Sequence, residues 1–332
     1  MLDASRWKSF LLNLLSPISD IPPTNPVFLA EMRRVHDFER NQRRTRQMCY
    51  LVFLAGMLMW SVFTLMMLIN PQTATGIYDD FYNLLWLALF GSLADKLVVD
   101  FGVINTGLTA ISDDIRTGRW ELVSLSSLST RHYVLGKFAA QQHLAWRLVA
   151  LSMTFRLTIM VVGALHIFIM PFFLPARIYD TSTPLVYFVR RMTENPPESL
   201  IIYAIYSLSA LGAAAMYCVE PRWRMSALTG STLAVSATGQ DITLSFLRGL
   251  LIIVRVWVSQ IIFAITGIMM LLLIVWLTAL FYTLTQSNLL VSLGIPLYVF
   301  LLGSFIRAVY NGLYERSIAR AYQTLVKRGG TP

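Results

Sequence analysis

"CYLVFLAGMLMWSVFTLMMLI", Cys49–Ile69, is an apolar run of 21 residues that no charged side chain interrupts. A helix of about 20 apolar residues crosses the roughly 30 Å hydrocarbon core of a bilayer and satisfies its own backbone hydrogen bonds there. The whole chain fits this pattern. Of its 332 residues 56% are hydrophobic and 14% are charged, whereas soluble domains carry about 25% charged residues. The sequence therefore predicts an all-α polytopic membrane protein.

Further apolar runs follow this first span along the chain. We expect spans at about 81–111, 148–174, 201–219 and 289–309. The stretch 225–241 admits a short span, a re-entrant piece or a helix continuing past Pro221, and the stretch 242–281 admits one long helix or two. We predict about six transmembrane helices, and eight would also satisfy the charge pattern.

Basic residues predict the orientation of the chain. The net charge is +9, and Lys and Arg concentrate on the cytosolic side of membrane proteins. We expect a cytosolic N-terminal segment at 1–48, a transmembrane domain at 49–309 with a cytosolic loop at 112–146, and a cytosolic tail at 310–332. The expected location is the cell (cytoplasmic or inner) membrane, crossed several times. No basic stripe interleaved with aromatics indicates nucleic acid as a partner.

The N-terminal segment contains a predicted amphipathic helix. Asn25 and Pro26 form a helix-start signal, since Asn caps a first turn and Pro needs no hydrogen bond there. Phe28 and Met32 then recur at helical spacing among several arginines. We expect this helix to lie on the membrane surface with its arginines on lipid phosphates. A plain cytosolic helix is the alternative.

"DIRTGRWEL", Asp114–Leu122, is a polar island between the second and third apolar runs. Gly118 lies where a helix can break or reverse, and Thr130 can cap the next helix, which leads into the third span. The island therefore predicts a helix leaving the membrane, a break, a short exposed helix and a helix returning. An ordinary solvated loop with weak surface ion pairs is the alternative.

The island resembles a motif in the membrane subunits of type-2 ATP-binding-cassette (ABC) exporters. Their pattern is an acid four residues before a glycine, then Thr-x-Glu-Leu-Leu, Pro-Leu-Ser and Leu-Gly-Lys. The matching residues here are Asp114, Gly118, Glu121, Leu122, Leu128, Ser129, Leu135, Gly136 and Lys137. This chain departs from the pattern at Arg119, Ser127 and Ile115. The amphipathic helix and about six spans extend the resemblance over most of the chain.

The resemblance implies that the island is a coupling loop, which docks into a separate ABC ATPase subunit and transmits its closure to the spans. Asp114 and Glu121 would pair with basic groups of that partner, and Arg116 and Arg119 with acidic ones. Trp120 would fill a pocket, since aromatic anchors carry much of the energy of an interface. Leu122 and Lys137 complete the expected coupling residues. A second permease chain, identical or similar, is also implied.

Motifs for chemistry are missing from the sequence. No G-x-x-x-x-G-K-[ST] phosphate loop, G-x-S-x-G or H-E-x-x-H occurs. Cys49 and Cys218 are isolated and match no metal motif. We therefore expect no catalytic residue, metal or cofactor on this chain, and ATP with Mg²⁺ on the partner subunit.

Ionisable residues interrupt the apolar runs at several places. They are expensive inside a membrane and usually face a bundle interior, a cavity or a partner charge. The candidates for a substrate path or a subunit interface are Asp95, Lys96, Asp100, Arg156, Arg248 and Arg255. Structural pairing across helices, or side chains reaching the cytosolic edge, is the alternative.

The leading hypothesis is a permease subunit of an ATP-driven ABC exporter. The alternative is a permease-like structural or anchor subunit of a larger membrane complex. An ion-coupled transporter using Asp95 and Asp100 ranks third, and a membrane-embedded enzyme last. The substrate stays open.

Overall fold

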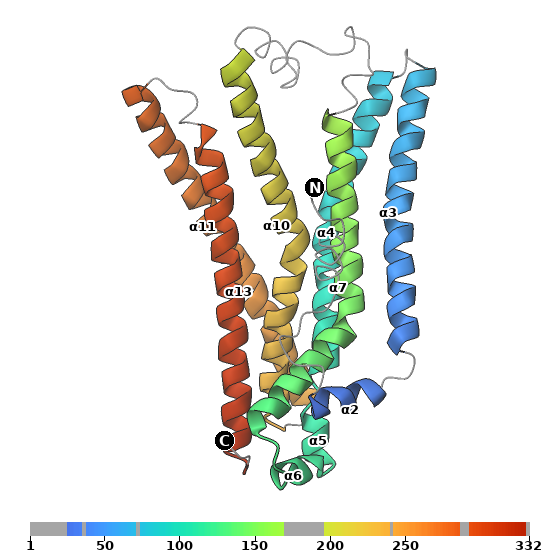
Figure 1. The fold of residues 1–332 in the computed structure, drawn as a ribbon, viewed down its shortest axis with the longest axis vertical. Coiled ribbons are helices and arrows are strands. Elements are labelled where there is room, and N and C mark those ends of the chain that lie inside the picture. The colour runs from blue at the N-terminus through green and yellow to red at the C-terminus, as the bar shows by residue number, and fades with distance from the viewer. Residues whose placement is uncertain are drawn as a thin grey trace, which may run out of the picture.

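The computed structural model describes residues 25–34, 38–70, 74–168, 196–239, 242–285 and 292–329. Throughout these ranges the regular structure is helical (Figure 1). The helices are α2 (Pro26–Arg34), α3 (Phe38–Ile69), α4 (Ala74–Gly107), α5 (Ser112–Arg116), α6 (Arg119–Ser124), α7 (Thr130–Phe168), α10 (Pro196–Ser236), α11 (Ile242–Thr285) and α13 (Gly294–Val326). The predicted all-α architecture is confirmed for the described residues.

Four of these helices are long and apolar enough to cross a membrane, namely Asn41–Ile69, Thr130–His166, Thr243–Leu280 and Gly294–Val326. This finding supports the prediction of a multi-pass membrane protein. Helices α4 and α10, with 34 and 41 residues, are of similar length and carry several charged residues. The predicted total of six or eight spans stays a prediction.

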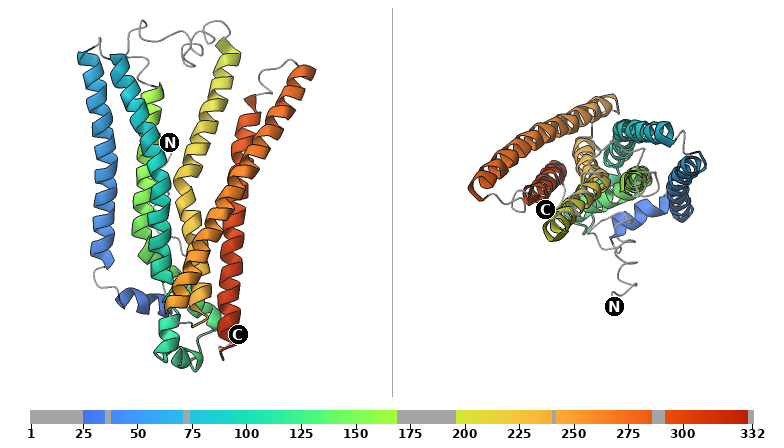
Figure 2. Two further views of the ribbon diagram at one scale, coloured as in Figure 1. Left: turned by 180° about the vertical axis from the view of Figure 1, so that it is seen from behind. Right: turned by 90° about the horizontal axis from the view of Figure 1, so that it is seen from above.

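The six long helices run side by side along the long axis, with α3 and α11 at opposite edges (Figures 1 and 2). The short helices α2, α5 and α6 gather at one end, which we call the α6 end (Figure 1). The C-terminus of α13 lies at the same end. Several helices spread apart toward the opposite end.

The main core lies where α4, α7, α10, α11 and α13 meet. Val103 of α4, Val149 of α7, Leu228 of α10 and Val256 of α11 are among its buried residues. Most apolar side chains of α3 and of α11 instead face outward, as for Leu58 and other exposed residues. Lipid is the environment that suits such surfaces.

Several element boundaries differ from the predicted ones. Helix α3 begins at Phe38 rather than Cys49, so it takes over the C-terminal half of the predicted amphipathic helix, of which α2 keeps Pro26–Arg34. Helix α13 likewise extends through the predicted tail to Val326. Polar residues at both places have good helix propensity and simply prolong the apolar helix. The first 24 residues of the N-terminal segment, and most of the loop expected at 175–200, lie outside the described residues.

The open alternatives after Val219 are resolved. Helix α10 continues through Pro221 to Ser236, and α11 is one helix from Ile242 to Thr285. Neighbouring helices supply enough contacts to keep a proline inside a helix despite its missing backbone donor.

Candidate functional site

The polar island folds as two short helices separated by a turn. Helix α5 ends at Arg116, Gly118 adopts a left-handed backbone conformation with φ of 72°, and α6 starts at Arg119. A glycine adopts this conformation at no steric cost, whereas other residues rarely do. The predicted break at Gly118 is therefore confirmed. Helix α7 begins at Thr130 itself rather than after it, and the Ser129 hydroxyl accepts from the His132 backbone N–H at 3.4 Å in the capping position.

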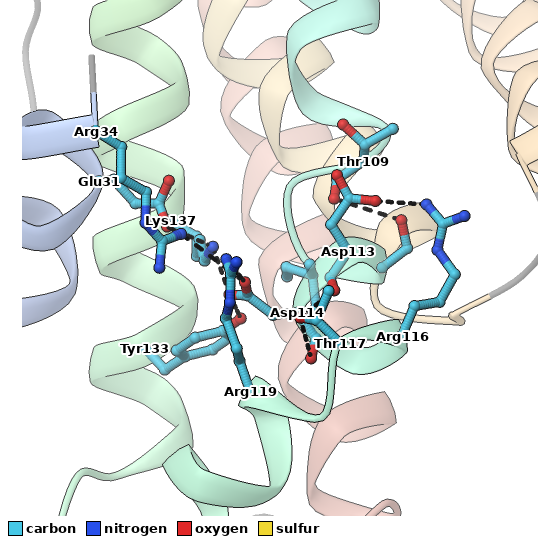
Figure 3. A network of polar contacts seen from close by, with 12 residues as sticks. Glu31, Arg34, Thr109, Asp113, Asp114, Arg116, Thr117, Arg119, Tyr133 and Lys137 are labelled. Atoms are coloured by element: carbon cyan, nitrogen blue, oxygen red, sulfur yellow. Dashed lines mark hydrogen bonds and ion pairs between the residues drawn. The ribbon is translucent and has the colours of Figure 1, made fainter. Parts of the chain in front are cut away.

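Asp114 is the centre of a buried network that joins α5 to α7 (Figure 3). The Tyr133 hydroxyl donates to Asp114 Oδ2 at 2.7 Å, and Lys137 Nζ lies 2.6 Å from the same oxygen. Arg119 Nη1 approaches Asp114 Oδ1 at 3.5 Å. Asp114 therefore pairs with cations of its own chain, and its carboxylate is not free for the partner that the sequence suggested.

Lys137 extends this network to α2. Its Nζ donates to Glu31 Oε1 at 2.7 Å, and Arg34 Nη1 donates to the same Glu31 oxygen at 2.9 Å. Lys137 itself is almost fully buried. One cation thus bridges carboxylates from two elements that are far apart in the sequence, and we call Glu31, Arg34, Asp114, Arg119, Tyr133 and Lys137 the Asp114 network.

Gly136 provides the space for α2 to dock on α7. A Cβ there would lie 2.6 Å from Asn25 Oδ1 and 2.8 Å from Val27 Cβ. Asn25 caps α2 by accepting from the backbone of Val27 at 2.9 Å, as predicted, and it also donates to the His132 carbonyl at 3.0 Å. The Gly136-Lys137 pair thus has a structural role in this chain: the glycine admits α2 and the lysine pairs with it.

The island is also attached to α10 and α13. The backbone N–H groups of Ile111 and Ser112 both donate to Ser236 Oγ, at 2.8 and 2.9 Å, at the end of α10. Trp120 is buried with its ring centroid 5.2 Å from that of Tyr133, in a cluster that includes Leu325 of α13. Trp120 therefore packs within the chain, and the expectation that it fills a pocket of a partner is corrected.

The outer face of the island stays exposed. Leu122 and Leu125 of the α6 region keep 71% and 85% of their surface accessible, and Arg116, Arg119 and Glu121 are exposed beside them. We call these five residues the tip surface. Two exposed leucines among mixed charges form the kind of patch that a protein partner covers.

The charge of Asp114 is favoured by its surroundings. Burial alone would raise the pKa of the Asp114 carboxyl, and the hydrogen bond and positive charge of Lys137 oppose this effect. The Tyr133 hydroxyl and Arg34 act in the same direction, so the pKa lies below its ordinary value of 3.8. The Asp114 carboxyl is therefore ionised at neutral pH.

A second set of charges lies inside the bundle, and we call Asp95, Asp100, Arg156, Glu220 and Arg224 the bundle cluster. Arg156 of α7 pairs with Glu220 of α10 at 2.9 Å and lies 3.8 Å from Asp95 of α4. Arg224 of α10 lies 3.2 Å from Asp100 and 3.6 Å from Glu220. The side chains of Arg156, Arg224 and Asp100 have no accessible surface.

Two further helices reach the bundle cluster. Trp257 of α11 donates its indole N–H to Asp100 at 3.2 Å, and the Tyr310 hydroxyl of α13 donates to Glu220 at 3.0 Å. Groups from α4, α7, α10, α11 and α13 thus meet around these charges. Buried charges tolerated in this way are paired and hydrogen-bonded, so pairing across helices describes Asp95, Asp100 and Arg156 in this structure.

The other predicted charges divide between two places. Lys96 is half-buried on α4 beside the bundle cluster and interacts electrostatically with Glu220, Arg224, Arg156 and Asp100. Arg248 and Arg255 of α11 line a separate cavity toward the α6 end. Glu220 and Arg224 are not among the predicted charges, because the predicted span 201–219 ends just before them. Their spacing of four residues would have indicated a shared helix face if the helix had been continued past Pro221.

No group of three or more His, Cys, Asp or Glu side chains in the described part of the chain is placed to hold a metal ion. Comparison of the chain with protein-family models, with curated proteins and with solved structures finds no match.

Proposed function

We propose that the chain is the permease subunit of an ATP-driven ABC exporter in the cell membrane. In this proposal both termini are cytosolic, the α6 end faces the cytosol, and the tip surface docks on a separate ABC ATPase subunit that binds ATP and Mg²⁺. A second permease chain, identical or similar, completes the path. The resemblance of the polar island to the coupling loop of these exporters is the source of the hypothesis.

The observation that carries the proposal is the combination of an exposed tip with a rigid attachment. Leu122 and Leu125 are open at the end of the molecule, while Asp114 ties the same element to α7 and α2. Ser236 adds α10. An ordinary solvated loop would carry only surface ion pairs, which contribute little to stability. It would not be attached to other helices in this way. A displacement of the tip surface would therefore also displace α2, α7 and α10.

The bundle cluster would extend a displacement of the tip surface to further helices of the bundle. Arg156 joins α7 to α10 and approaches α4, so these helices are expected to move together. In the proposal, closure of the ATPase dimer displaces α5 and α6, and the attached helices change the access of the path from one side to the other. Two discrete arrangements of packed helices are what such coupling requires.

The proposal is tested by purifying the tagged protein from its native cells in mild detergent and identifying what accompanies it. The variants are Glu121→Arg and Leu122→Asp on the tip surface. Glu315→Arg is the matched control, because Glu315 is an exposed acid on α13 away from the tip. We expect an ATPase subunit with the wild type and the control, and its loss from both tip variants.

The same purification tests the anchor-subunit alternative, and a transport measurement tests the ion-coupled alternative. A stable complex of other membrane proteins without any ATPase would favour the anchor subunit. Transport driven by a proton gradient and abolished by Asp95→Asn would favour the ion-coupled transporter. Retention of the ATPase by both tip variants would contradict the docking role of the tip surface.

A further inference from the structure

A cavity of about 330 Å³ lies between α10, α11 and α13. It is lined by Arg248 and Arg255 of α11 and by Arg320 and Lys327 of α13, with Ile252 and Val256 on its apolar side. Small-molecule sites in proteins span about 300 to 1,000 Å³. The cavity is thus large enough for a polar headgroup rather than for a whole lipid.

The charge of the cavity has one sign. Its lining includes four cations and no acidic side chain within the described residues. None of the four forms an ion pair with a described residue, in contrast to Arg156 and Arg224 of the bundle cluster. Four cations around one small space repel one another unless an anion lies among them.

The position of the cavity indicates where such an anion comes from. Arg248 lies near the start of the apolar span Thr243–Leu280, and Lys327 follows the end of the span Gly294–Val326. Leu251 and Val254 on the same stretch of α11 are 66% and 57% exposed, as expected for residues that face lipid. The cavity therefore lies at the boundary between an apolar surface and a polar end, where the headgroups of a bilayer lie.

We infer that this cavity binds the phosphate group of an anionic phospholipid. The guanidinium groups of Arg248, Arg255 and Arg320 donate to the phosphate oxygens, since the arginine fork matches that geometry. Lys327 adds a further charge. Ile252 and Val256 contact the first carbons of the acyl chains. The site is independent of the tip surface and of the proposed transport role.

The inference is tested with the full-length protein in detergent, by following its thermal denaturation as lipid is added. The probes are phosphatidylglycerol, phosphatidylcholine and inorganic phosphate. The cavity variant is Arg248→Gln with Arg320→Gln. The matched control is Arg131→Gln with Arg316→Gln, because both of those arginines are exposed and neither lines the cavity.

We expect phosphatidylglycerol to stabilise the wild type, with phosphatidylcholine and inorganic phosphate far weaker. The cavity variant should bind phosphatidylglycerol about 25-fold more weakly, since each of its two substituted arginines contributes about fivefold near an anionic lipid. The control should change affinity by less than about twofold, since its arginines lie outside the cavity. If the cavity variant does not fold, Arg320→Gln with Lys327→Gln replaces it, because both side chains are exposed on the last turns of α13.

Three results would overturn the inference. Equal weakening of phosphatidylglycerol binding in the cavity variant and the control would show that general surface charge, rather than the cavity, attracts the lipid. Equal binding of phosphatidylcholine would show that negative charge is not recognised. Stabilisation by inorganic phosphate that matches that by phosphatidylglycerol would assign the cavity to a soluble phosphate instead of a lipid.

Discussion

Lys137 occupies an unusual position for a lysine, since it is buried between the carboxylates of Asp114 and Glu31 at 2.6 and 2.7 Å. Substituting Lys137→Met should lower the free energy of unfolding by about 3 kcal/mol, because two partly buried carboxylates lose their shared cation. Titration with denaturing detergent measures this change. Arg116→Gln is the control, as its pair with Asp113 is exposed and contributes under about 1 kcal/mol. An equal loss of unfolding free energy in Lys137→Met and Arg116→Gln would contradict the assigned role of Lys137.

Asp114 gives the network a defined pH dependence. Its pKa is lower in the folded protein than the ordinary 3.8, so its charge stabilises the fold at pH values above 3.8 and that contribution is lost as the pH falls through the folded value. The stability advantage of the wild type over Asp114→Asn should therefore be complete at neutral pH and shrink below 3.8. Melting temperatures across this range test it, and a constant difference would be the contrary result. Asp113→Asn, at an exposed site, should show little difference at any pH.

At the residue scale the sequence indicates which positions of the island are special without indicating what they contact. Gly118 was predicted from local backbone rules, which need no partner. Asp114 and Trp120 were assigned outward contacts, yet they face Tyr133 of their own chain. The partners come from α2 and α7, and residue types alone do not reveal which distant elements meet.

Helix α2 is held on α7 by a close approach at Gly136. Gly136→Val should displace α2 and destabilise the protein by about 2 kcal/mol, because the new side chain would occupy the place of Asn25 and Val27. Limited proteolysis at Arg33 and Arg34 should then become faster. Gly163→Ala on the same helix meets nothing within 4 Å and should leave the digestion unchanged. Unaltered proteolysis of Gly136→Val would show that the approach is not required.

The pairing of α4 with α10 depends on Asp100 and Arg224. A double-mutant cycle with Asp100→Asn and Arg224→Gln should give a coupling energy of about 1 kcal/mol or more, because the two groups share a buried network. Unfolding in detergent provides the four free energies. A cycle of Asp100→Asn with Arg248→Gln is the control, since Arg248 lines the separate cavity. No coupling in the first cycle would contradict the role of the pair.

At the element scale the strongest predictions came from strong local signals. The cap at Asn25 was confirmed, and α7 begins within one residue of its predicted cap at Thr130. The helices continue past the predicted span limits at Cys49 and Val309, because a helix does not end where its side chains become polar. Continuation through Pro221 depends on packing against neighbours, which the sequence does not display.

At the scale of the whole molecule, the all-α class followed from composition, and the arrangement did not. Apolar runs predict helices that can span a membrane, but they carry little information on which helices are neighbours, because lipid and protein surfaces are equally apolar. The meeting of five helices around the bundle cluster and the basic cavity beside α11 were visible only in three dimensions.

Docking of the tip surface on an ATPase subunit can be tested by photo-crosslinking in native cells. A photoreactive residue is placed at Leu125 and, as a control, at Ile69, since these side chains are 85% and 73% exposed at different places. We expect a covalent adduct between the ATPase subunit and position 125, and none with position 69. An adduct at neither position, or only with other membrane proteins at position 125, would contradict it.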